Sequence, residues 1–276
     1  MIQMTIPSLS LHDDIEIPQL GLGALCLLSE DTQELVEVAL DAGYRRVDVA
    51  AAQGNEEGVG SALAASGLPR EDYFIATRLA DVPAGRDETL AAFEGSLERL
   101  GLDHVDLLLL DRSAPPGFFD AWGALEEIHR EEAARAIGVA NFRIEDLELL
   151  KEEMRMRPAV NRVELHPWLQ QAELRAWHSE QGIVTEAWSP LAQGALLDDQ
   201  TIVRIAESHG RTPAQAIVRW HIQLGNVAIP KAVTPERIHE LVACFDFELS
   251  EEEMSTMAGM ERGIRIGPDT AELALP

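Results

Sequence analysis

The sequence is short of positive charge. Its 276 residues carry 22 Lys and Arg against 48 Asp and Glu, a net charge of −26, and only Lys151 and Lys231 are lysines. Nucleic acids and anionic membranes are held by clustered Lys and Arg, which this composition does not supply. We therefore expect neither as a partner, and expect a small-molecule substrate instead.

Cysteine and long apolar runs are also scarce. Cys26 and Cys244 lie far apart and outside any C-x-x-C spacing, which excludes a disulfide framework and a zinc site and predicts no bound metal. No stretch approaches 18 uninterrupted apolar residues, and the opening MIQMTIPSLS lacks the basic and apolar regions of a signal peptide. We expect a cytoplasmic protein.

What is present is a regular alternation of apolar strands and amphipathic helices. SLSL and IEIP, separated by a polar turn at 12–14, predict an N-terminal hairpin. Strand-like segments such as FIATRL and VDLLLLD then alternate with helical ones such as EEGVGSALAAS. Apolar strands covered by helices predict a parallel sheet, here an α/β fold closed as a (β/α)8 TIM barrel in one domain, 1–276. Its chemistry is then expected just after each strand.

Seven segments in order resemble the aldo-keto reductases, in particular the bacterial 2,5-diketo-gluconate-reductase-like branch. They are IPQLGLGA, AGYRRVDVAAAQGNEEGVG, SLERLGLDHVDLLLLD, AIGVANF, AVNRVELHP, EAWSPLAQG and IPKAVTPERIHELV. The resemblance spans some 230 residues and implies a barrel that reduces carbonyl groups with NADPH. A fold does not fix a function, so the site is considered residue by residue.

Family members place Asp, Tyr, Lys and His around the substrate carbonyl, with Tyr as the proton donor. The resemblance retains Asp48 but puts Gln53 at the tyrosine, Arg78 at the lysine and Asp111 at the histidine. Gln cannot donate and recover a proton at neutral pH, and Arg does not titrate in a protein. Tyr44 and Tyr73 precede strands, at the other end of the barrel. These replacements predict that the chain is not a standard NADPH-dependent carbonyl reductase.

The resemblance preserves about half of the cofactor positions. Lys231 lies where the family grips the 2′-phosphate of NADPH, and Trp188 where an aromatic ring stacks on the nicotinamide. Arg162 replaces one of the residues that hold the nicotinamide amide. The positions implied are Asn141, Arg162, Trp188, Ser189, Leu191, Gln193, Lys231, Arg237 and Glu240. We expect NADP(H) to bind, and the residues leave open whether it transfers hydride or serves as a wall of the site.

Three positions that line the family's substrate cleft with aromatic rings are Leu25, Ala80 and Arg112 here, which predicts a wider cleft that is more polar on one side. The histidines are assigned to packing, local hydrogen bonds or the surface.

Three classes of function compete for the altered site. Asp48 and Asp111, expected to face the barrel mouth with Arg78 between or beside them, favour a non-redox acid–base enzyme such as a cyclase, dehydratase or isomerase, because two carboxylates beside one cation can have their pKa values driven apart. The alternatives are an NADPH-dependent oxidoreductase with an atypical proton relay, and a pseudoenzyme or binding protein. A structural ion-pair network would have the same residue pattern.

Overall fold

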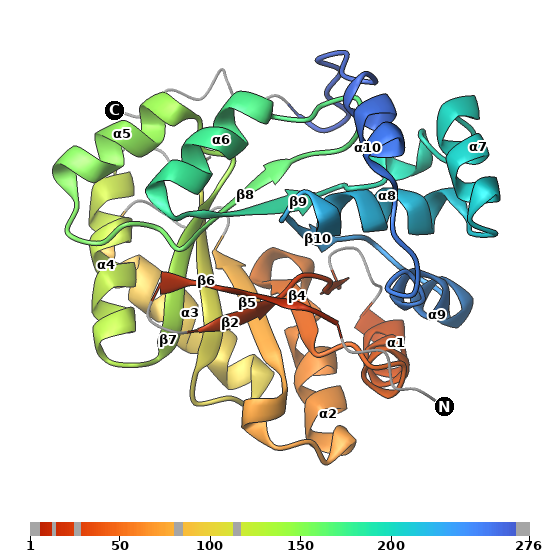
Figure 1. The fold of residues 1–276 in the computed structure, drawn as a ribbon. Helices are drawn as coiled ribbons and strands as arrows, with labels where there is room; N and C mark the ends of the chain where they lie inside the picture. Colours follow the sequence, from red (N-terminus) through yellow and green to blue (C-terminus); the bar gives the residue numbers. More distant parts are fainter. Residues whose placement is uncertain (1–5, 13–14, 25–28, 80–84, 113–116, 269–276) are drawn as a thin grey trace.

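The computed structural model describes residues 6–12, 15–24, 29–79, 85–112 and 117–268. It forms a parallel barrel surrounded by helices, with a short antiparallel hairpin lying across it (Figure 1). The strands are β1 Ser8–Ser10, β2 Glu16–Pro18, β3 Leu22–Gly23, β4 Arg46–Ala50, β5 Phe74–Leu79, β6 Val105–Asp111, β7 Ala134–Ala140, β8 Val160–Glu164, β9 Val184–Trp188 and β10 Val227–Ile229. The fold is the predicted (β/α)8 TIM barrel with an N-terminal hairpin.

Helices connect successive strands on the outside of the barrel. They are α1 Ser29–Asp41, α2 Glu56–Ser66, α3 Arg86–Leu100, α4 Phe118–Arg130, α5 Ile144–Glu153, α6 Ala172–Gln181, α7 Gln200–Ser208, α8 Pro213–Gln223, α9 Pro235–Val242 and α10 Glu251–Ala258. None of the helices in the described segments is long and apolar enough to cross a membrane.

The sheet runs β3 to β10 in sequence order, each strand parallel to the next. The two ends of the sheet meet at the segment before β3: the Ala228 nitrogen donates to the Gln19 carbonyl at 2.7 Å, and the Gly21 nitrogen donates to the Ala228 carbonyl at 3.1 Å. Because all these strands run the same way, their carboxyl ends meet at one mouth.

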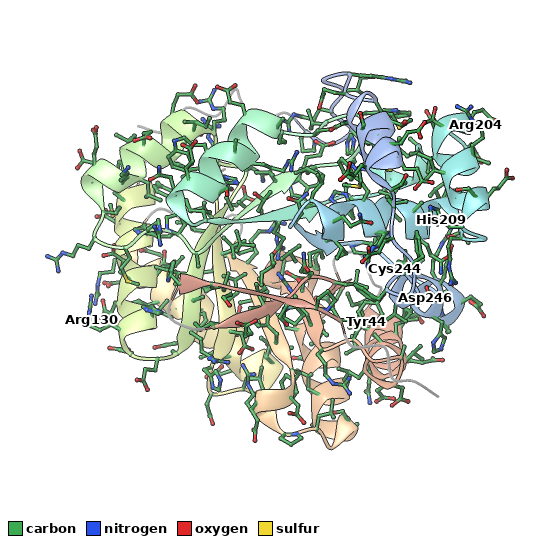
Figure 2. The ribbon with its side chains drawn as sticks, in the orientation of Figure 1. Tyr44, Arg130, Arg204, His209, Cys244 and Asp246 are labelled. Atoms are coloured by element: carbon green, nitrogen blue, oxygen red, sulfur yellow. The ribbon has the colours of Figure 1, made fainter. Side chains whose placement is uncertain are left out.

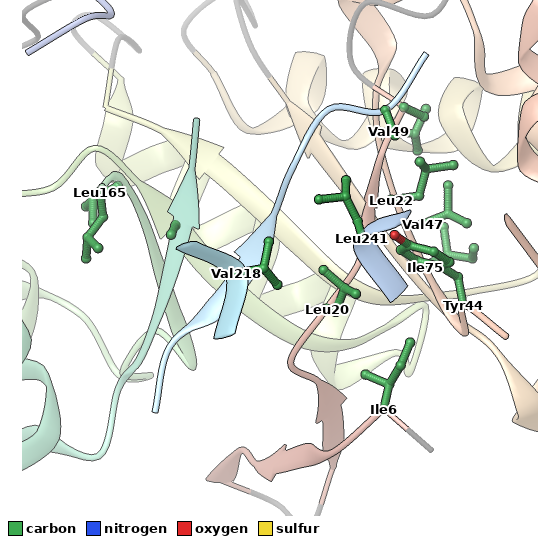
Figure 3. Packing of buried hydrophobic residues seen from close by; sticks show 14 of the residues in the cluster. Ile6, Leu20, Leu22, Tyr44, Val47, Val49, Ile75, Leu165, Val218 and Leu241 are labelled. Atoms are coloured by element: carbon green, nitrogen blue, oxygen red, sulfur yellow. The ribbon is translucent and has the colours of Figure 1, made fainter. Parts of the chain in front are cut away.

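Two hydrophobic layers hold the barrel. The larger one lies between the strands and the surrounding helices, and Figure 3 shows part of it, where Leu22 and Val47 lie close to Leu241 of α9. The smaller one fills the end of the barrel opposite the mouth, where Ile15 and Ile17 of the hairpin region pack against Phe74 and Leu107. The hairpin therefore plugs the amino-terminal end of the barrel and leaves function to the mouth.

Candidate functional site

Four polar or aromatic side chains at neighbouring strand ends form one connected chain, which we call the strand-end chain: Arg78 of β5, Asp111 of β6, Asn141 just after β7, and Trp188 of β9. Arg78 Nη1 donates to Asp111 Oδ2. Asn141 Nδ2 donates to Asp111 Oδ1 at 3.2 Å, and the Trp188 indole nitrogen donates to Asn141 Oδ1 at 2.8 Å. The sequence predicted all four as site residues, and the structure brings them together.

The strand-end chain is partly open to solvent. The Arg78 side chain is 23% exposed and that of Asp111 is 8% exposed. The Arg78 Nε–H is buried and has no hydrogen-bond partner. A guanidinium that holds a carboxylate with one nitrogen can donate from an exposed N–H to a carbonyl oxygen.

A second group of charges lies deeper in the barrel, and we call it the inner network: Arg46 and Asp48 of β4, Arg162 of β8 and Glu186 of β9. Asp48 accepts hydrogen bonds from Arg46 Nε at 2.9 Å and from Arg162 Nη2. Glu186 also accepts from both arginines. None of these four side chains is more than 2% exposed. The network pairs two cations with two carboxylates, as buried charges require.

Burial and pairing act in opposite directions on the inner network. Burial lowers the pKa of Arg162, and the neighbouring Arg46 adds to this effect, while Glu186 opposes it. Burial raises the pKa of Glu186, but Arg162 and Arg46 outweigh it and leave that pKa below its usual value. The carboxylate is thus held ionised between the two guanidinium groups.

The inner network corrects the expected arrangement of the acid–base pair. Arg78 binds Asp111, whereas Asp48 is fully buried between Arg46 and Arg162. The two carboxylates do not share Arg78, and Asp48 does not face the mouth. An acid–base enzyme needs both carboxylates within reach of its substrate.

Other predicted positions are placed as follows. Gln53 lies in the exposed 3-10 turn Ala51–Gln53 that follows β4. Ser189, Leu191 and Gln193 follow β9 in a turn where Ser189 and Gln193 have left-handed backbone angles, φ 49° and 53°. Arg162, expected beside the nicotinamide, is 2% exposed and is held by Asp48 and Glu186.

The positions after β10 that the sequence predicted to bind the nucleotide are Lys231, Arg237 and Glu240. Lys231 is exposed and forms no ion pair in the part of the chain that the structure describes. Arg237, near the start of α9, pairs with Glu240 one turn later.

Of the three predicted cleft positions, Leu25 and Ala80 lie outside the described residues. Arg112 is buried and binds Asp146 through its Nε at 2.6 Å. It therefore does not line an open cleft as the polar wall that the resemblance implied. Tyr44 is buried beside Cys244, where its hydroxyl donates to the Ile238 carbonyl (Figure 2). The described residues hold no group of His, Cys, Asp and Glu that could bind a metal ion.

The structure also adds a contact that the sequence did not suggest. Glu164, the last residue of β8, is buried and accepts the backbone N–H groups of Ile266 at 2.6 Å and Gly267 at 3.0 Å. A β-carbon on Gly267 would lie 2.2 Å from the Trp188 ring. Burial raises the pKa of Glu164, but His166 and these N–H groups outweigh it and leave the pKa below its usual range. The carboxylate thus fixes residues 266–267 against the strand-end chain.

The sequence offered signals for some of the residues it missed. Arg46 and Glu186 are charged residues at buried positions of the strands RVDVA and VTEAW, where an unpaired charge would not be tolerated. The contact between Glu164 and residues 266–267 joins positions about a hundred residues apart and has no local signal.

The family model described as "Aldo/keto reductase family" matches residues 19–262. The chain belongs to this family. An aldo-keto reductase from Mycolicibacterium smegmatis is 51% identical over 95% of this chain and 96% of its own length. A glyoxal reductase from Bacillus subtilis is 44% identical over 96% of this chain and 97% of its own. The crystal structure of a Bombyx mori aldo-keto reductase in complex with NADP is 28% identical, covers 97% of this chain and 96% of its own, and has a TM-score of 0.90.

These relatives overturn the non-redox interpretation of the altered site. Proteins named as reductases are 44% to 51% identical to this aldo-keto reductase over almost its whole length. The acid–base interpretation depended on Asp48 and Asp111 acting as a pair, and the inner network removes Asp48 from the mouth. The prediction that the chain is not a carbonyl reductase of the family's usual kind was therefore wrong, and the oxidoreductase alternative fits better.

Proposed function

We propose that this aldo-keto reductase is an NADP(H)-dependent oxidoreductase that reduces the carbonyl group of a small molecule at the strand-end chain. The observation that carries the proposal is the Arg78–Asp111 pair at the mouth, where the Arg78 side chain is 23% exposed and Asp111 is hydrogen-bonded through Asn141 to Trp188. The family membership and the relatives named as reductases support the reaction class.

Arg78 binds and polarises the carbonyl oxygen in this proposal. As the carbonyl carbon is reduced, negative charge develops on the oxygen, and a fixed guanidinium N–H stabilises that charge. Arg78 cannot supply the proton itself, because an arginine does not titrate in a protein. The proton comes from a water molecule at the exposed side of Arg78, and the Asp111 carboxylate orients both the guanidinium and this water toward the same oxygen.

NADP(H), when bound, supplies the hydride. Trp188 offers an aromatic surface for the nicotinamide. The exposed Lys231, which has no ion pair among the described residues, offers a cation for the 2′-phosphate. Arg237 contributes less charge, since Glu240 already neutralises it. Arg162 acts indirectly, by fixing the inner network beneath the mouth.

The substrate class that we propose is a short aldehyde. The name of the Bacillus subtilis relative, a glyoxal reductase, supports it. The net charge of −26 supports small molecules over nucleic acids or anionic membranes as partners. We also propose a cytoplasmic location, where NADPH is available, and fractionation of cells that express the tagged protein tests it.

The test is NADPH oxidation with glyoxal and with longer aldehydes. We expect turnover that depends on the protein, and a loss of about 10²-fold in kcat for Arg78→Gln, since removing one donor to a developing oxyanion costs 10²- to 10³-fold. The pH profile of kcat in Asp111→Asn tests the proton route. Arg204→Gln, an exposed α7 arginine without an ion pair in the described residues, is the matched control and should leave kcat unchanged.

Two outcomes contradict parts of the proposal separately. Turnover that Arg78→Gln and Asp111→Asn leave intact would retain the reductase but exclude the strand-end chain as its polarising group. Tight binding of NADP⁺ without oxidation of NADPH by any aldehyde would make the chain a binding protein.

A further inference from the structure

A cavity of about 200 Å³ lies between the carboxyl ends of α5 and α6, far from the candidate site. The two helices lead into the first residues of β8 and β9, whereas Asn141 and Trp188 lie at the mouth, where strands end. The cavity has room for roughly seven water molecules at liquid density. It is too small for a dinucleotide and suits a ligand of modest size.

The wall of the cavity is apolar at its base. Leu147, Pro158 and Ile183 are buried there, and Met154, Met156 and Trp177 are partly exposed. The Trp177 indole nitrogen donates to Glu148 at 3.0 Å, which fixes the ring. The two methionines can adjust to different ligand shapes.

Three cations line the same cavity: Lys151, Arg155 and Arg157. Within the described residues none of them forms an ion pair, and neither arginine side chain forms a hydrogen bond. No Asp or Glu of the described residues lines the cavity, although the full sequence has 48 of them. Most other arginines of the described chain are paired with carboxylates, whereas Arg155 and Arg157 are not.

The charge around this cavity is positive on balance, and the backbone that carries the arginines is held in place. The carboxyl ends of α5 and α6 each contribute a partial negative charge of roughly one half, which is less than the three full positive charges. The loop that carries the arginines is held in place by the buried Glu126 carboxylate, which accepts the backbone N–H groups of Arg155 at 3.0 Å and Met156 at 2.8 Å. The cations are thus presented from an ordered backbone.

We infer that this cavity binds a small amphipathic anion, with its apolar body against Trp177 and the methionines and its carboxylate or phosphate head on Arg155 and Arg157. The inference is independent of the proposed reductase activity, since it uses none of the strand-end residues.

The experiment titrates hexanoate, hexyl phosphate and uncharged hexanamide into the ¹⁵N-labelled full chain and follows the Trp177 indole N–H signal, assigned by its loss in Trp177→Phe. We expect hexanoate or hexyl phosphate to shift this signal with an affinity at least tenfold above that of hexanamide. The two anions distinguish a carboxylate site from a phosphate site.

The double variant Arg155→Gln, Arg157→Gln should bind the anion at least tenfold more weakly. Its thermal midpoint should stay unchanged, because neither guanidinium is paired in the described chain. Arg204→Gln on α7, on the other side of the molecule from α5 (Figure 2), removes the same charge and should change the affinity less than twofold. Equal binding of hexanoate and hexanamide, no shift at Trp177, or an affinity that the double variant leaves unaltered would each overturn the inference.

Discussion

At the scale of single residues, Arg162 is one of the two cations that hold the inner network together. Its guanidinium contacts both Asp48 and Glu186, and all three side chains are buried. Arg162→Gln would leave the two carboxylates with Arg46 alone. Breaking a buried ion pair from one side costs about 3 to 5 kcal/mol, and we expect a loss of that size in the free energy of unfolding measured with urea.

Arg162→Lys and Arg86→Gln are the comparisons for this prediction. Lysine keeps the charge but cannot bind two carboxylates with a planar fork. Arg162→Lys should therefore lose less free energy of unfolding than Arg162→Gln. Arg86 forms its ion pairs at the surface, with Glu127 and Asp87, and its variant should unfold at the wild-type urea midpoint. A stability of Arg162→Gln equal to that of Arg86→Gln would show that the inner network contributes nothing.

The sequence predicted the members of the strand-end chain but not the pairing of charges behind it. Arg78 and Asp111 were found through the resemblance to the aldo-keto reductases, and both lie at strand ends, where the fold itself concentrates chemistry. The pairing of Asp48 with Arg162 joins β4 and β8, and alternation along each strand shows only that a side chain points inward. Which inward cation reaches which carboxylate depends on the stagger of the strands around the barrel.

At the scale of elements, strands were predicted most accurately. FIATRL and VDLLLLD are β5 and β6 to the residue, since continuous apolar runs between polar turns leave little freedom. No separate prediction was made for α10, whose polar, glutamate-rich sequence has little apolar periodicity.

Two helix glycines allow a matched test of how closely α2 and α3 pack. A β-carbon at Gly60 of α2 would lie 2.3 Å from the Leu100 carbonyl oxygen at the end of α3, whereas one at Gly123 of α4 would meet nothing within 4 Å. We expect Gly60→Ala to lower the free energy of unfolding by roughly 1 to 3 kcal/mol, because the two helices must separate. Gly123→Ala should raise it by up to about 1 kcal/mol, the difference in helix propensity. A stabilising Gly60→Ala would contradict the close packing.

At the scale of the whole molecule, buried histidines make stability depend on pH. Burial lowers the pKa of His178 to about 4 and that of His221 to about 3. Both are neutral in the fold but charge near pH 6.5 when unfolded. Their contribution is therefore complete above pH 6.5 and is lost as the pH falls toward 4 and 3. Between pH 7 and pH 5 we expect the free energy of unfolding to fall by roughly 2 kcal/mol for each histidine.

Urea titrations at the two pH values measure this loss, and variants assign it. His178→Asn should reduce the difference between pH 7 and pH 5 by about half, whatever its effect on stability at pH 7. His239→Gln, at an exposed position of α9, should leave the difference unaltered. If His178→Asn shows the full wild-type difference in free energy of unfolding between pH 7 and pH 5, other groups cause the acid sensitivity.

The inner network also constrains how this chain can vary over generations. Its four members lie on β4, β8 and β9, and they balance two positive charges against two negative ones in a space closed to water. A single replacement by an uncharged residue leaves an unbalanced charge inside the barrel, whereas a compensating second replacement removes it. Descendants of this sequence are therefore expected to change these positions in pairs or not at all, and the order in which such replacements are accepted is restricted accordingly.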